Sequence, residues 1–184
     1  MNNQKRPYTL SILVEDTPGV LSQVARLFSR KGYNIESICA GNTERPGVTR
    51  ISVVTTVDEK TIQQLSTQLS KLLLVISVEV LTGDDSIQRE LTFIKVKAET
   101  RDQRDDIIQI VNVFRASILD MGRESLTIAV VGTEEKTLAI MDLLEDFGIL
   151  ETARSGVIAL QRGKHTIYDY TKDREEYHRG KNIL

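Results

Sequence analysis

The chain has 184 residues, a length that fits one large domain or two small ones. Its 24 basic and 26 acidic residues give a formal net charge of −2, which excludes the simple picture of a basic nucleic-acid-binding protein. Apolar residues make up 40% of the chain, enough to bury a core, whereas only 5% is aromatic. Stacking platforms for bases are therefore not expected either.

The sequence predicts neither a membrane-bound nor a secreted protein. The longest uninterrupted apolar run, residues 72–76, is far too short to span a bilayer, and the polar N-terminal segment has no signal-peptide core. The single cysteine, Cys39, cannot form an intramolecular disulfide, which fits a reducing compartment. We therefore expect no membrane partner and a cytoplasmic location, or the plastid stroma if the chain is plastid-encoded.

Side chains that commonly catalyse reactions are scarce in this chain. The two histidines, His165 and His178, both lie near its C-terminal end, and one cysteine cannot form a zinc cluster. No histidine is close in sequence to a candidate serine nucleophile, and neither phosphate-binding glycine motif, GxGxxG or GxxxxGK[ST], occurs. We therefore expect no catalytic, metal or cofactor site in this chain.

The first half of the chain alternates strand-like and helix-like patterns. They predict strands over 8–15, 34–40, 48–57 and 75–81 and helices over 20–31 and 58–73. Asp16 or Thr17 is expected to cap the first helix, with Pro18 in its first turn, and residues 41–47 are expected to form a polar turn. The resulting βαββαβ order is that of a ferredoxin-like fold.

The second half repeats this order after a polar break, which we interpret as a linker over 83–88. The expected strands cover 90–99, 117–121, 126–131 and part of 149–160, with helices over 102–115 and 134–147. Residues 53–62 also parallel residues 129–138, an offset of 76 that separates Lys60 from Lys136. We therefore predict an α+β protein of two tandem ferredoxin-like domains, over 8–82 and 89–163, with antiparallel sheets and helices on one face.

The last segment, 164–184, is charged and contains three of the five tyrosines. The segment is expected to form either a short helix near 172–179 or a disordered tail, and we favour a solvated tail. The alternative is a segment that docks on the protein through Tyr168, Tyr170 and Tyr177.

The turn between the first strand and the first helix has the features of an anion site. A helix start offers unpaired N–H groups and a partial positive charge. Gly19 has no side chain, so an anion can approach the backbone closely, and the amides of Gly19, Val20 and Leu21 are the expected donors because Pro18 has none.

Two polar side chains could complete a site for a free amino acid. Asp16 can pair with an ammonium group, and Asn34, at the start of the second predicted strand, offers an amide donor and acceptor. Judged on spacing alone, a plain helix cap is the commoner explanation of this turn.

Four strings of residues carry a family resemblance. Residues 16–24 (DTPGVLSQV), followed by 30–38 (RKGYNIESI), resemble the ACT domain of acetolactate (acetohydroxyacid) synthase small subunits. Residues 114–120 (FRASILD) and 153–163 (ARSGVIALQRG) match this family too. The resemblance covers residues 8–163, so the first domain is identified as an ACT domain and the second as ACT-like; the segment after Gly163 lies outside it.

The resemblance implies a regulatory subunit that is not an enzyme by itself. Its partner would be the thiamine-diphosphate-dependent catalytic large subunit, which makes acetolactate from pyruvate in branched-chain amino acid biosynthesis. Small subunits of this family stimulate that enzyme and make it sensitive to feedback by valine, in some members also by leucine or isoleucine. Thiamine diphosphate, magnesium and FAD are then expected only in the catalytic partner.

The resemblance also implies a homodimer, because family members hold the effector between two ACT domains. The positions that match the effector site are Asp16, Thr17, Gly19, Val20, Leu21, Asn34 and Ile35. Asp16 stands where the family often has Asn, and its charge favours the effector's ammonium group but repels its carboxylate. Val20 and Ile35 are expected to line an apolar pocket or to be ordinary core residues. A free-standing amino-acid sensor that acts on another partner, or a small enzyme on this scaffold, remains an alternative.

Overall fold

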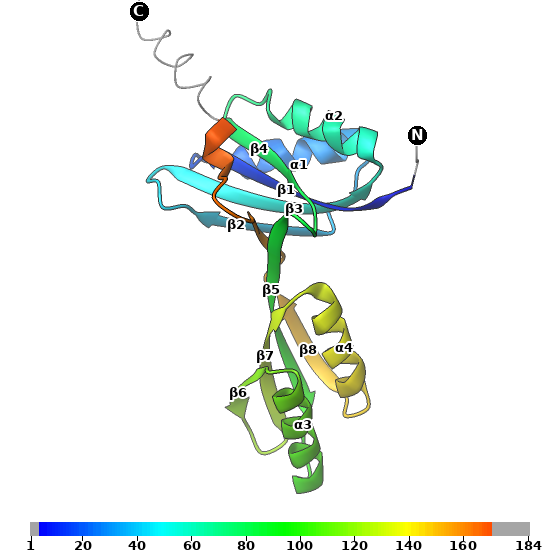
Figure 1. Ribbon diagram of the computed structural model, residues 1–184. Coiled ribbons are helices and arrows are strands. Elements are labelled where there is room, and N and C mark those ends of the chain that lie inside the picture. Colours follow the sequence, from blue (N-terminus) through cyan, green and yellow to red (C-terminus); the bar gives the residue numbers. More distant parts are fainter. Residues whose placement is uncertain (1–3, 171–184) are drawn as a thin grey trace, which may run out of the picture. The chain divides into compact units, whose positions relative to one another are not determined.

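The structure, a computed structural model, describes residues 4–170 of the chain and contains two compact units (Figure 1). The N-terminal unit comprises the described residues up to Ile87 together with those from Ala159 onward, and the C-terminal unit comprises Gln88–Ile158. None of the helices in the described part is long and apolar enough to cross a membrane.

The N-terminal unit has the predicted βαββαβ order. Its elements are β1 (Arg6–Glu15), α1 (Val20–Lys31), β2 (Ser37–Asn42), β3 (Val48–Val57), α2 (Glu59–Leu69) and β4 (Val75–Leu81). The strands form an antiparallel sheet in the order β2-β3-β1-β4, with both helices on one face. This arrangement confirms the predicted ferredoxin-like fold.

Every second residue of β1, from Tyr8 to Val14, contributes an apolar side chain to the core beneath the helices, although the whole stretch is buried. Leu10 lies opposite Val53 and Ile12 opposite Ile51, and all four side chains are almost completely buried. Helix α1 adds Val24 and α2 adds its own apolar stripe to the same core. Burying each large aliphatic side chain contributes about 1.5–3 kcal/mol, so this layer holds the unit together.

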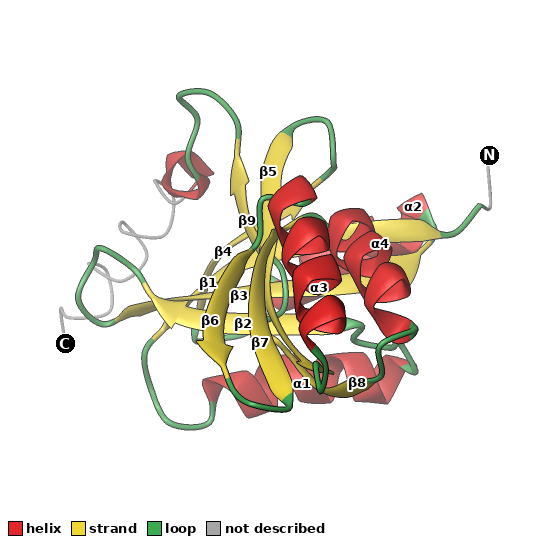
Figure 2. Ribbon diagram, turned by 90° about the horizontal axis from the view of Figure 1, so that it is seen from below, coloured by secondary structure: helices red, strands yellow, loops and turns green. Residues whose placement is uncertain are grey.

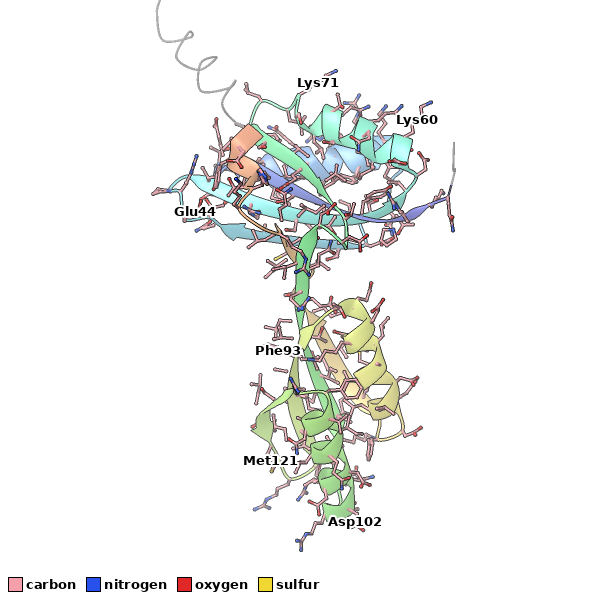
Figure 3. The ribbon with its side chains drawn as sticks, in the orientation of Figure 1. Glu44, Lys60, Lys71, Phe93, Asp102 and Met121 are labelled. Carbon is pink, nitrogen blue, oxygen red and sulfur yellow. The ribbon has the colours of Figure 1, made fainter. Side chains whose placement is uncertain are left out.

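The C-terminal unit repeats the same topology. Its elements are β5 (Ser86–Lys97), α3 (Arg101–Val113), β6 (Ser117–Met121), β7 (Ser125–Gly132), α4 (Glu134–Glu145) and β8 (Ile149–Arg154). The sheet order is β6-β7-β5-β8, and a further strand, β9 (Ile158–Gln161), pairs with β5. Helices α3 and α4 lie side by side on one face of the sheet (Figure 2). The other face exposes apolar side chains such as Phe93 on β5, which is 40% exposed (Figure 3).

The boundary between the units, between Ile87 and Gln88, lies inside the predicted linker over 83–88. Strand β5 already begins at Ser86, whose hydroxyl donates to the carbonyl of Thr82, so the polar break is shorter than predicted. The chain from Ala159 onward groups with the N-terminal unit, although its strand β9 pairs with β5. One contact responsible is the Arg162 amide, which donates to the Asp85 carbonyl at 2.8 Å.

The C-terminal segment docks on the N-terminal unit as far as the structure describes it. A 3-10 helix, η1 (Ile167–Tyr170), buries Ile167 to 2% exposure, and Ser77 on β4 donates to the Ile167 carbonyl at 3.2 Å. The described part of the segment therefore docks through Ile167 and Tyr168, whereas residues 164–166 and Asp169 are exposed, as in the solvated tail that we favoured. Tyr177 and the predicted helix near 172–179 lie outside the described residues.

Candidate functional site

The turn after β1 leads into a helix that no side chain caps. Gly19 is the N-cap residue, with a left-handed backbone (φ 87°), so the predicted cap at Asp16 or Thr17 is wrong, and Pro18 precedes the helix. The chain turns first instead: the Thr17 amide donates to the Glu15 carbonyl at 2.8 Å. Because Asp16 and Thr17 are part of this turn, α1 begins only at Val20.

The start of α1 presents amide donors to an open surface. The Val20 amide points to the Thr17 carbonyl at 3.4 Å, whereas no acceptor is found in the described structure for the amides of Leu21 and Ser22. The first turn of α1 has no acidic residue, so the partial positive charge of the helix start is not compensated there. A Cβ atom built at Gly19 would meet nothing within 4 Å, which leaves room for an anion.

The side chains around this turn divide between the core and the surface. Val20 is only 8% exposed and belongs to the core, so it is the ordinary core residue that we named as one possibility, whereas Leu21 is 44% exposed. The Asp16 side chain is exposed, and its amide donates to the Gly47 carbonyl at 2.8 Å. The effector loop, defined here as residues 16–21, is thus fixed to the turn between β2 and β3.

The second group of predicted site residues lies at the other end of α1. Strand β2 begins at Ser37, not at Asn34 as predicted, because left-handed Gly32 ends the helix and residues 33–36 form a connection. The Asn34 carbonyl accepts from the Thr55 hydroxyl at 2.7 Å, and the Asn34 side chain is exposed. Ile35 is half-buried and packs against the core.

The predicted site residues therefore lie in two separate groups within one chain, which we call half-sites. One is the effector loop, and the other is the pair Asn34 and Ile35. Helix α1 separates them, and its 12 residues span roughly 18 Å. A free amino acid is too short to contact both half-sites of the same chain.

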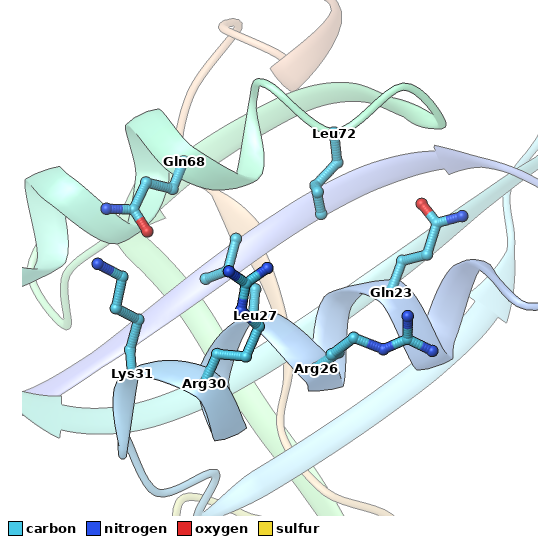
Figure 4. Close-up of a pocket in the computed structure, with 7 residues that line it drawn as sticks. All are labelled: Gln23, Arg26, Leu27, Arg30, Lys31, Gln68 and Leu72. Atoms are coloured by element: carbon cyan, nitrogen blue, oxygen red, sulfur yellow. The ribbon is translucent and has the colours of Figure 1, made fainter.

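Sequence reasoning missed a basic groove between α1 and α2 (Figure 4). It has a volume of about 550 Å³ and is lined by Gln23, Arg26, Leu27, Arg30, Lys31, Gln68 and Leu72. The signal was present in the sequence, because Arg26 and Arg30 share one face of a helix that contains no acidic residue. The groove is cationic and suits an anionic partner.

A charged cluster in the C-terminal unit has a structural role. Glu90 on β5 is 3% exposed, and the Arg154 guanidinium donates to both of its carboxylate oxygens at 2.7 and 2.9 Å. Arg154 also contacts Glu134 at 3.1 Å. The hydrogen bond to Glu90 is the main reason that the pKa of Arg154 is raised. The next residue, Ser155, exchanges two hydrogen bonds with Leu91, so the A-R-S-G string holds the end of β8 against β5.

The part of the chain between residues 4 and 170 contains no group of three or more His, Cys, Asp or Glu side chains that could hold a metal ion.

Comparisons with known proteins assign the family. Residues 10–77 match the family described as AHAS small subunit-like ACT domain, and residues 89–163 match the family described as small subunit of acetolactate synthase. The acetolactate synthase small subunit of Mycolicibacterium smegmatis is 45% identical over 167 residues, which cover 91% of this chain and 98% of that protein. The probable acetolactate synthase small subunit of Methanothermobacter thermautotrophicus is 42% identical over 87% of this chain and 95% of its own length.

A solved structure agrees with these relatives. The crystal structure of the acetolactate synthase small subunit from Thermotoga maritima matches with a TM-score of 0.80 and 36% identity, covering 87% of this chain and 99% of that one. Two matching domain families, full-length relatives and a solved structure thus give one answer. The chain belongs to the family of acetolactate synthase small subunits.

Proposed function

We propose that this chain is the regulatory subunit of an acetolactate synthase and makes the catalytic subunit sensitive to a branched-chain amino acid, valine first. Its family membership supports a partnership with the catalytic subunit. Thiamine diphosphate, magnesium and FAD would then be held by the catalytic subunit, and this chain would supply the effector site.

The observation that carries the effector proposal is the separation of the two half-sites. Strand β2 lies at the edge of its sheet, where its outer backbone groups can pair with another strand. Two copies related by a two-fold axis would pair their β2 strands antiparallel. The six residues of β2 span roughly 20 Å, about the length of α1.

This pairing brings complementary half-sites together. Asn34 precedes β2, and the turn that follows β2 is bonded to the effector loop through Gly47 and Asp16. Antiparallel pairing therefore places Asn34 of one copy beside the effector loop of the other. A homodimer would contain two such sites, each built from both copies.

The side chains and amides of the two half-sites fit the parts of a branched-chain amino acid. The effector carboxylate would accept hydrogen bonds from the amides at the start of α1, and Asp16 would pair with its ammonium group. The apolar side chain would contact Leu21 of one copy and Ile35 of the other. Asn34 would bond the effector and close the site.

Feedback then follows from linkage between effector binding and the state of the holoenzyme. Valine can inhibit only if it binds one state of the complex more tightly than another. A coupling of about 1–3 kcal/mol changes activity several-fold to about a hundred-fold. An effector that joins two copies has this difference available, because it binds only when the two half-sites face each other.

Two measurements test the proposal. Isothermal titration with valine, leucine and isoleucine identifies the effector, and acetolactate formation by the catalytic subunit is followed with and without this chain and the effector. We expect stimulation by the chain and inhibition after valine is added. No effect on the catalytic subunit, at any ratio of the two chains, would refute the function.

A further inference from the structure

The segment beyond the family match contacts the N-terminal unit at a specific place. The match ends at residue 163, whereas η1 follows it and lies beside β4 (Figure 1). Ile167 anchors the segment through its burial and through the bond from Ser77. The next residue, Tyr168, is therefore held in a defined position.

Tyr168 contacts the turn that joins β2 to β3. The Arg45 guanidinium lies over its ring, with 3.6 Å between the guanidinium carbon and the ring centroid. Glu44 lies in the same turn (Figure 3). The pKa of its carboxyl is lowered, first by its own backbone amide and second by the nearby Tyr168 hydroxyl. The Tyr168 side chain thus stacks on Arg45 and lies close to the preceding residue of the turn, Glu44.

The same turn holds the effector loop. Two residues after Arg45, the Gly47 carbonyl accepts the Asp16 amide at 2.8 Å. The Thr43 hydroxyl braces the turn internally by donating to the Val48 carbonyl at 3.0 Å. A continuous series of contacts therefore runs from Tyr168 through Arg45 and Gly47 to Asp16.

We propose that Tyr168 is a positioning residue for the effector site: it stacks on Arg45, fixes the turn over 43–47 and thereby holds the effector loop in its binding conformation. A loop that is ordered before binding does not lose that freedom when the effector arrives. The consequence for effector affinity rests on the proposed function, whereas the ordering of the turn does not.

Two readouts test this role in the full-length chain. The first is hydrogen exchange of the Asp16 amide and of the turn over 43–47, measured without effector. The second is the valine concentration that gives half-maximal inhibition of the reconstituted enzyme. The variants are Tyr168→Leu, Tyr168→Phe and Arg45→Gln, and Arg101→Gln in the C-terminal unit is the control because its side chain is 92% exposed.

Tyr168→Leu and Arg45→Gln are expected to speed exchange of the Asp16 amide and raise the half-maximal valine concentration, each by about two- to five-fold, the factor typical of an exposed cation–π pair. Combining Tyr168→Leu with Arg45→Gln should change the two readouts no more than either single variant does, since each substitution removes the same contact. Tyr168→Phe keeps the ring and should therefore stay close to the wild type in both readouts. Arg101→Gln should change neither readout.

Unchanged exchange in Tyr168→Leu, with the fold intact by circular dichroism, would overturn the proposal. Faster exchange with unchanged valine sensitivity would overturn its link to the effector site. A wild-type enzyme without any valine response would instead count against the proposed function, and the exchange experiment would still decide whether Tyr168 orders the turn.

Discussion

Replacing Gly19 with Asp puts a second carboxylate where the effector carboxylate is proposed to bind. The new side chain has room, because a Cβ atom at Gly19 meets nothing within 4 Å. Its backbone cost is moderate, since the φ of 87° lies in the left-handed region, where Asp and Asn are the best tolerated residues after glycine. The fold is therefore expected to survive.

The loss of effector affinity can be estimated from charge repulsion. Two carboxylates about 4 Å apart repel each other by about 1 kcal/mol in water and about 4 kcal/mol near a protein surface. Gly19 is exposed, so the true value lies between these limits and corresponds to a loss of roughly five-fold to several hundred-fold in affinity.

The matched control is Gly19→Asn, which has the same size and backbone tolerance but no charge. Inhibition by valine is measured for both variants in the reconstituted enzyme, with stimulation in the absence of valine as the check on assembly. We expect Gly19→Asp to lose most of its valine response and Gly19→Asn to keep much more of it. Equal inhibition of the two variants would refute a carboxylate site at this helix start.

Three further predictions follow from particular contacts. Asn34→His should weaken valine inhibition roughly ten-fold, because a polar contact in a closed site is worth about 1–3 kcal/mol; a lowered melting temperature with unchanged inhibition would show that Asn34 only shapes its turn. Arg154→Met should destabilise the protein by about 2–3 kcal/mol in urea unfolding, less than a fully buried pair because Arg154 is 38% exposed, and Glu90→Gln added to it should recover much of the loss. The pKa of Asp58 is lowered by hydrogen bonds from the Thr61 amide and hydroxyl, so its stabilising effect exists above the ordinary pKa of aspartate and is lost as the pH falls through the lowered one; the difference in melting temperature from Asp58→Asn should shrink accordingly, and a pH-independent difference would contradict this.

Periodicity predicted the elements well where each residue has one clear environment. The strand over 48–57 was predicted at its observed bounds, because its buried and exposed positions mostly alternate. The helix over 58–73 ends at Leu69 instead, where Ser70 donates its hydroxyl to the Ser66 carbonyl. The apolar run 72–74 that follows fits a helical stripe and a packed turn equally well, so its pattern could not locate the helix end.

The site was harder to predict because contacts distant in sequence determine its shape. Asp16 is a better capping residue than glycine, yet the hydrogen bond from the Asp16 amide to the Gly47 carbonyl holds this segment in a turn. No local pattern reports a contact between residues 31 positions apart. The docking of Tyr168 on Arg45 is equally invisible to composition, which favours a solvated tail for so charged a segment.

The most direct test of the central claim, an effector site built from two copies, is a mixing experiment. Gly19→Asp and Asn34→His chains are purified separately, unfolded and refolded together, and valine binding is measured by calorimetry. A mixed dimer has one doubly defective site and one site in which both half-sites are intact. We therefore predict that each variant alone binds valine only with weakened affinity, whereas roughly a quarter of the sites in the mixture bind with wild-type affinity, since half of the dimers are mixed and each has one intact site. No recovery, with mixed dimers demonstrated by mass spectrometry, would contradict a site shared between two copies.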